Sequence, residues 1–146
     1  MLIRLIPLFL LLFFSSAALA EKPPVFSDRA GAIRGYDPVA YFDKKGPVRG
    51  AQQFSHQWNG ATWYFASAAN RDKFAAMPEK FAPQYGGYCA YGVAQGYAPE
   101  IDPDAWSIVD GKLYLNLDRS IQARWNKDIP GYIRKANENW PKVLKE

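Results

Sequence analysis

The stretch that decides the fold runs from Gln52 to Ser67 and reads "QQFSHQWNGATWYFAS". Ring-bearing side chains alternate with small polar ones from Phe54 to Trp58, which is the period-two pattern of a strand. Asn59–Gly60 follows, and both residues tolerate the positive φ angles of a type I′ turn. We therefore predict a β-hairpin whose returning strand covers residues 62–65.

The hairpin is followed by a predicted helix and, further on, by a second hairpin. Ser67 is suited to cap a helix over residues 68–77, on which Phe74 and Met77 lie three positions apart. Pro78 and Pro83 are expected to end this helix. Two short apolar runs, 107–109 and 112–115, flank the tight-turn pair Asp110–Gly111.

The C-terminal part has helical periodicity. Ile121, Trp125 and Ile129 recur at four-residue spacing behind Asp118 or Ser120, either of which is suited to cap a helix. A second amphipathic stretch begins at Pro130 and ends near Pro141. The fold class predicted is α+β, with a small antiparallel sheet built from hairpins and packed with about three helices. Residues 21–34 are predicted to be an extended leader, and residues 35–146 a domain with C-terminal helices.

The first twenty residues have the pattern of a signal peptide. Arg4 precedes an apolar run, and Ala18-Leu19-Ala20 before Glu21 is the small-x-small pattern of a cleavage site. The apolar run is shorter than the roughly 20 residues that cross a bilayer, so a membrane anchor is the weaker reading. The protein is predicted to be exported to the periplasm, with secretion as the alternative, and to keep no stable membrane span after cleavage.

The net charge and the share of aromatic residues bear on the partner and on the stability of the protein. The formal net charge is only +4 at pH 7, and basic residues are interspersed with acidic ones, which gives no reason to expect a nucleic-acid partner. Aromatic residues make up 16% of the chain, and large rings bury much area in a small domain that has no disulfide.

The single cysteine, Cys89, lies in the Gly- and Tyr-rich stretch "PQYGGYCAYGVAQGY", residues 83–97. It has no partner for an intramolecular disulfide, so three roles stay open: a buried inert thiol, an intermolecular partner or a reactive group. A helix that begins near Tyr88 would bring backbone N–H groups to the thiolate and lower its pKa. Cys89 is the catalytic candidate if the protein is redox-active.

Other side chains could complete a site around this cysteine. His56, the single histidine, pairs with Cys89 in one hypothesis, and with Asp37 in addition they form a candidate Cu or Zn site. Rings from the two Tyr-containing segments are candidates to line a ligand pocket together with Asp37: Tyr36, Tyr85, Tyr88 and Tyr91. The alternatives are ordinary core positions for the rings, a strand-surface position for the histidine and a turn-forming role for Asp37 before Pro38.

Three stretches carry a resemblance to a known family. They read "GYDPVAYF" (35–42), "NGATWYFASAANRDKFAAMPEKFAPQYGGYCAYGVAQG" (59–96) and "DPDAWSIVDGKLYLN" (102–116), with "NWP" after them. With these stretches the chain resembles the YHS domain family, in the form found in exported bacterial proteins. The resemblance spans nearly all of residues 35–141.

The wider family resembles small metal-binding modules with the pattern F-C-S-x-x-C-x-x-x-F, whose thiolates suit soft metals. Phe65, Ser67 and Phe74 match this pattern here, but Ala66 and Asn70 stand at the two cysteine positions. Ala40 likewise stands where some modules carry a cysteine. The metal chemistry of the wider group is therefore not transferred to this chain. Some exported members are described as selenoproteins at the position of Cys89, and this resemblance implies redox use of that position.

Together these observations predict a binding or sensing module for a small ligand or metal ion, centred on the Cys89 loop, in preference to an enzyme. One alternative is a thiol-dependent redox protein that uses Cys89. Another is a structural domain whose aromatic surface docks a second exported protein.

Overall fold

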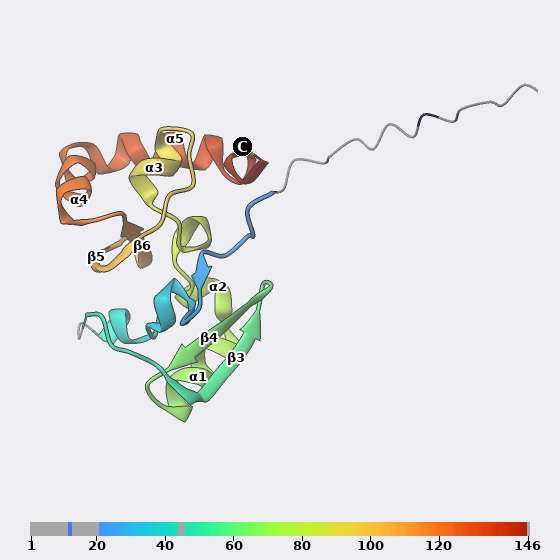
Figure 1. Ribbon diagram of the computed structural model, residues 1–146. Coiled ribbons are helices and arrows are strands. Elements are labelled where there is room, and N and C mark those ends of the chain that lie inside the picture. The colour runs from blue at the N-terminus through green and yellow to red at the C-terminus, as the bar shows by residue number, and fades with distance from the viewer. Residues whose placement is uncertain (1–11, 13–20, 44–45, 146) are drawn as a thin grey trace, which may run out of the picture.

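Figure 1 shows the computed structural model, which describes residue 12, residues 21–43 and residues 46–145. The predicted signal peptide lies outside the described residues apart from Leu12, so its cleavage stays a prediction. Within the described residues, no helix is both long enough and apolar enough to cross a bilayer.

The first predicted hairpin is confirmed. It consists of β3 (Ala51–Trp58) and β4 (Ala61–Phe65), paired antiparallel. The turn residues Asn59 and Gly60 have φ angles of 50° and 75°, as a type I′ turn requires. Because side chains alternate along a strand, one face of β4 directs its rings into the core, where Trp63 and Phe65 are completely buried.

The helix after this hairpin is also confirmed. α1 (Ala68–Ala76) begins at Ser67, whose hydroxyl accepts a hydrogen bond from the Asn70 N–H at 3.1 Å. Its buried residue Phe74 packs on Trp63 and Phe65, with ring centroids 5.0 and 5.2 Å apart. Pro78 follows the end of this helix and also begins a second short helix, α2 (Pro78–Phe81). At the first position of a helix the backbone N–H has no partner within the helix, so a proline there loses no hydrogen bond.

The second half contains the other hairpin and the C-terminal helices. Its turn residues Asp110 and Gly111 have φ angles of 51° and 74°, which confirms the predicted tight turn. Asp118 is the cap of the first C-terminal helix and accepts from the Ile121 N–H at 2.7 Å. The elements of this half are α3 (Ala90–Ala94), β5 (Asp102–Val109), β6 (Lys112–Asn116), α4 (Arg119–Trp125) and α5 (Ile129–Asn139).

The segment predicted as an extended leader is more ordered than expected. It forms a minimal hairpin of β1 (Ser27–Asp28) and β2 (Gly31–Ala32), followed by a turn of 3-10 helix. Val25, Ala32 and Ile33 are buried. These apolar residues are too few to give a periodic pattern, yet each is covered by the rest of the fold, so the segment belongs to the packed core.

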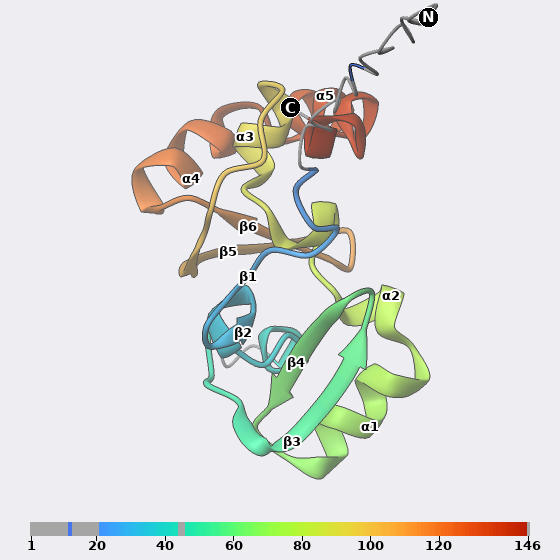
Figure 2. The ribbon, with the colours of Figure 1, turned by 45° about the vertical axis from the view of Figure 1, so that its right-hand side comes forward.

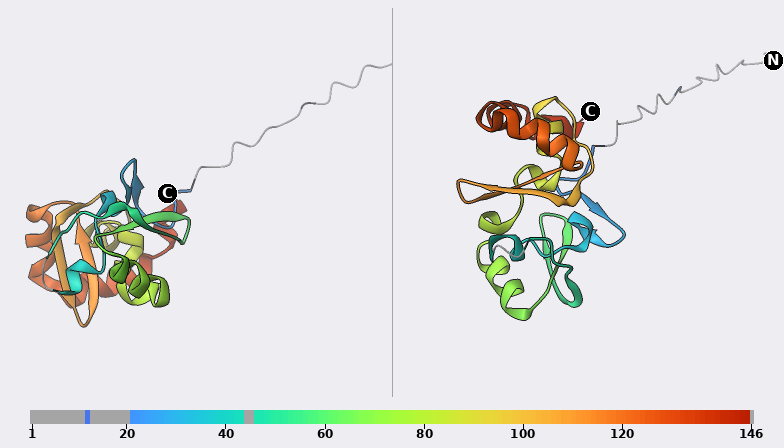
Figure 3. Two further views of the ribbon diagram at one scale, coloured as in Figure 1. Left: turned by 90° about the horizontal axis from the view of Figure 1, so that it is seen from below. Right: turned by 90° about the vertical axis from the view of Figure 1, so that its left-hand side faces the viewer.

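The elements form two halves. In Figure 2, β3, β4, α1 and α2 lie at one end and α3, α4 and α5 at the other, with the β5–β6 hairpin and the leader between them; Figure 3 agrees. The α+β prediction is confirmed, although in the described residues the strands form three separate two-stranded sheets. Two buried clusters result, one around Trp63 and Phe74 and one around Tyr85 and Trp125.

A buried carboxylate fastens the first half together. Asp37 is completely buried, and one of its oxygens accepts from the N–H groups of Val39 at 2.8 Å and Ala40 at 3.3 Å. The other oxygen accepts from the Ala66 N–H at 2.9 Å and from Asn70 Nδ2 at 2.8 Å. The predicted turn-forming role is thus present, and the same side chain also joins the turn to the β4–α1 junction.

This arrangement predicts a large effect of Asp37→Asn. An asparagine side chain has one oxygen and one NH₂ group in place of the two carboxylate oxygens. Whichever way it is turned, its NH₂ group faces two groups that are themselves hydrogen-bond donors. The free energy of unfolding should therefore fall by about 2–4 kcal/mol. Urea unfolding measures the change, and Asp104→Asn, at an exposed position, should change it by less than about 0.5 kcal/mol. Equal stability of Asp37→Asn and the parent protein would show that the carboxylate does not fasten this half.

Candidate functional site

Cys89 lies at the boundary between the two halves and is 1% exposed. It caps α3, and its Sγ accepts hydrogen bonds from the N–H groups of Gly92 at 3.4 Å and Leu117 at 3.2 Å. The thiol in turn donates to Asn116 Oδ1 at 3.5 Å. The sulfur therefore joins the start of α3 to the end of β6.

Burial decides the acidity of this thiol. Loss of solvation raises the pKa of Cys89 and outweighs the lowering by the N–H groups of Gly92 and Leu117. The expected helix near Tyr88 is present, but the expected lowering of the pKa is not. Because the thiolate is the reactive form, the geometry favours a packing role for Cys89 over an activated nucleophile.

Asn116 is a buried polar residue that the sequence analysis did not single out. Its Oδ1 accepts from both Cys89 and the Tyr91 N–H, the latter at 3.0 Å. Among the described residues its Nδ2 has no hydrogen-bond partner, although the residue is completely buried. A lone amide inside the apolar run from Leu113 to Leu117 was the signal that could have pointed to it.

His56 lies on the inward face of β3 and is half-buried. Its ring stands edge-on to Phe74, with centroids 6.2 Å apart. In the described part of the chain it makes no hydrogen bond to Cys89, and no three His, Cys, Asp or Glu side chains gather in a group that could hold a metal ion. The packing against Phe74 gives the histidine a place in the aromatic core.

The three positions at which the resemblance implies cysteines all lie close to Asp37 in this chain. The resemblance puts thiolates of metal-binding modules at residues 40, 66 and 70. Here the backbone N–H groups of Ala40 and Ala66 and the amide of Asn70 all donate to Asp37. In this chain the three positions supply donors to a carboxylate and carry no thiolate, so these residues do not fit a soft metal ion.

The predicted tyrosines are distributed over the structure rather than gathered around the thiol. Tyr85 and Tyr88 are buried, and their hydroxyls donate to Asn137 Oδ1 at 2.9 Å and to the Pro23 carbonyl at 2.8 Å. Tyr91 packs against the Tyr132 ring, with centroids 5.1 Å apart. Tyr36 lies under the Arg49 guanidinium, 5.1 Å from its ring centroid. Of these rings, Tyr85 also lines a cavity.

That cavity, which we call the junction cavity, has a volume of about 390 Å³ and lies where the two halves meet. Trp58 and Trp63 of the β3–β4 hairpin line it, and so do Tyr85 and Trp140 of the second half. The two pairs have centroid separations of 6.0 and 6.1 Å. Four rings from distant parts of the sequence therefore share one cavity.

Gly86 sets how closely the Cys89 loop approaches this cavity. Its φ angle is +62°, and a Cβ atom on it would collide with the Pro24 carbonyl and lie 3.3 Å from the Trp140 ring. Pro83, Gln84 and Tyr85 precede it along the same wall. The beginning of the loop thus contributes to a ligand-sized space, while Cys89 itself is in the core.

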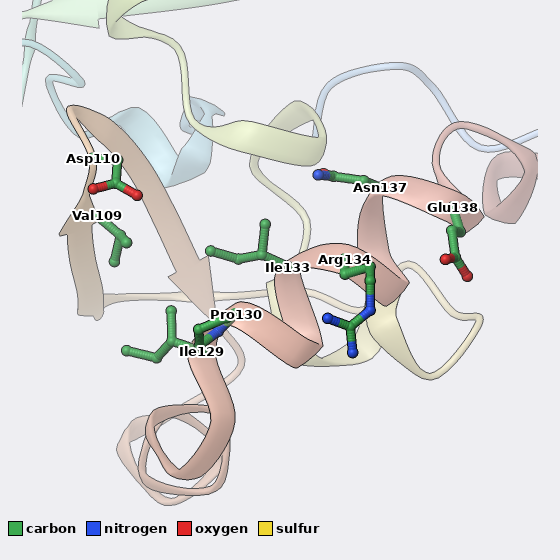
Figure 4. A pocket seen from close by; sticks show the side chains of 8 residues that line it. All are labelled: Val109, Asp110, Ile129, Pro130, Ile133, Arg134, Asn137 and Glu138. Carbon is green, nitrogen blue, oxygen red and sulfur yellow. The ribbon is translucent and has the colours of Figure 1, made fainter.

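A second depression, the hairpin–helix groove, has a volume of about 550 Å³. Figure 4 shows it between the turn of the β5–β6 hairpin and α5, with Val109 on the hairpin side and Ile129 and Ile133 on the helix. Its charged residues are of both signs: Asp110, Arg134 and Glu138. This mixture gives the groove no preference for a ligand of one charge.

The comparison with known families agrees with part of the resemblance. Residues 39–85 match the family model of the YHS domain. The match covers less than half of the chain, so what is shown is a YHS domain over residues 39–85. No curated protein and no solved structure matches the chain.

The YHS match covers the first half of the fold from Val39 to Tyr85. It includes the β3–β4 hairpin, α1, α2 and the residues that donate to Asp37. Trp58 and Trp63 of the junction cavity belong to it, whereas Trp140 lies beyond it. The cavity is therefore built jointly by residues of the YHS match, Tyr85 among them, and by residues at the C-terminal end such as Trp140.

The surroundings of Cys89 predict a silent thiol. At pH 8 the native protein should react with an aromatic disulfide reagent at least roughly tenfold more slowly than free cysteine, because the thiol is protonated and covered. In denaturant one thiol per chain should react fully, and Cys89→Ala provides the zero level. Rapid labelling of the native protein would contradict this account.

The raised pKa of Cys89 also affects stability. The neutral thiol stabilises the native state in full at a pH below the pKa that Cys89 has in the unfolded chain. This contribution is lost as the pH rises through the pKa that Cys89 has in the folded protein.

Proposed function

We propose that this YHS protein is an exported module that binds a small ligand in the junction cavity. The observation that carries the proposal is one cavity of about 390 Å³ lined by rings from both halves. Ligand sites are concave and roughly 300–1,000 Å³ in volume, with rings that cover the ligand and polar groups that orient it. Asn59, Glu79 and Gln84 provide such polar groups at the edge of the rings.

The Cys89 loop contributes to this site through its first residues. Tyr85 and Gly86 line the cavity, so a ligand there would contact the loop without reaching the sulfur. The contacts of Cys89 are internal ones, to Gly92, Asn116 and Leu117. This favours ligand binding over thiol chemistry as the use of the loop.

Export is a separate part of the proposal and rests on the sequence of residues 1–20. The apolar run followed by Ala18-Leu19-Ala20 supports cleavage before Glu21. The intact mass of the protein recovered from a periplasmic extract checks this part. We expect a chain that begins at Glu21, and a recovered chain that retains residues 1–20 would contradict cleavage.

Ligand binding predicts a rise in melting temperature that depends on the cavity rings. A library of sugars, amino acids, aromatic acids and organic cations is screened by thermal unfolding, since a ligand at one hundred times its Kd stabilises the native state by about 2.7 kcal/mol. Trp58→Leu should abolish the rise measured against the variant's own melting temperature. Trp106→Leu, which changes another half-buried tryptophan outside the cavity, should keep it.

Two results would count against the proposal. One is a library in which no compound raises the melting temperature of the parent protein. The other is a rise that Trp58→Leu retains in full, because the ligand would then bind elsewhere.

A further inference from the structure

The lining of the junction cavity has a chemical preference, and we infer that it binds an organic cation with a substituted ammonium group. This inference rests on the proposed function, because it names the class of ligand for the same cavity. It is carried by two features of the lining: the gathering of aromatic rings and the sign of the charge beside them.

The rings supply the first feature. The face of an aromatic ring is negative, and tryptophan attracts a cation placed over its face more strongly than tyrosine or phenylalanine does. Three of the five tryptophans of the chain, Trp58, Trp63 and Trp140, line this cavity. Trp58 and Trp140 are half-buried and so keep part of their surface accessible, while Trp63 and Tyr85 are buried behind them.

The charge supplies the second feature. Among the described residues that line the cavity, Glu79 is the one with a charged side chain, and no lysine or arginine is present. Lys80, its neighbour in α2, lies over the Phe81 ring, 5.3 Å from the centroid, and does not line the cavity. The lining therefore has a negative edge that favours a cation and disfavours a carboxylate or a phosphate.

The shape of the lining separates a substituted ammonium from other cations. A bare metal ion needs several oxygen, nitrogen or sulfur ligands, and Glu79 is the one carboxylate among the described residues that line the cavity. A methylated ammonium needs no hydrogen-bond acceptor and spreads its charge over methyl groups that pack on rings. The amide side chains of Asn59 and Gln84 remain for a hydroxyl or other polar group on the same ligand.

Choline and its uncharged isostere 3,3-dimethylbutan-1-ol provide the test, because the two differ in charge and hardly in shape. Calorimetric titration of the full mature chain should give a Kd for choline at least roughly tenfold lower than that for the isostere, which corresponds to about 1.4 kcal/mol. Glu79→Gln should weaken choline binding by roughly tenfold and leave binding of the isostere unchanged. Glu138→Gln, an exposed glutamate on α5 outside this cavity, should bind choline like the parent protein.

Three outcomes overturn the inference: no binding of choline, equal binding of the isostere, or unchanged choline binding in Glu79→Gln. The proposed function is judged separately. If other compounds of the library still raise the melting temperature in a way that needs Trp58, the cavity binds a ligand of another class. If no compound does, the cavity is not a binding site and both proposals fail.

Discussion

The carboxylate of Asp37 is the interaction on which the first half of this protein depends. A buried charge is costly unless it is fully hydrogen-bonded, and here four donors from two separate segments satisfy it. Those donors hold the end of β4 and the first turn of α1 in one place. The rings carried by these elements, Trp63, Phe65 and Phe74, then meet in a single buried cluster. Residues 40, 66 and 70, where the resemblance implies metal-binding thiolates in related modules, here supply donors to this carboxylate.

The second half is joined to the first through the loop of residues 83–97. Gly86 passes between Pro24 and Trp140 with a positive φ angle, and Cys89 joins the start of α3 to the end of β6. The junction cavity exists because these close approaches bring Trp140 to the same place as the tryptophans of the first hairpin. The glycines of this loop thus allow the close approach that forms the cavity, while the cysteine is buried in the core and does not line it.

Local signals in the sequence were sufficient to predict most of the secondary structure. Asn59–Gly60 and Asp110–Gly111 determine tight turns by backbone conformation alone, and Ser67 and Asp118 cap helices within three residues of themselves. The non-local features were not predictable. Burial of Ile33 in the leader, the raised pKa of Cys89 and the meeting of Trp58 with Trp140 in one cavity all depend on how distant segments pack. The family resemblance correctly indicated a YHS domain, which the match over residues 39–85 confirms, but it gave no indication of the cavity.

An organic cation that binds where the two halves meet would change the tryptophan indole N–H signals, and these signals test such binding most directly. The five indole signals in an ¹⁵N–¹H spectrum are assigned by single substitutions, and choline is then titrated into the protein. The account predicts that the signals of Trp58, Trp63 and Trp140 shift in a saturable way, while those of Trp106 and Trp125 stay in place. A spectrum in which none of the three cavity signals moves, or in which only Trp106 and Trp125 move, would contradict it.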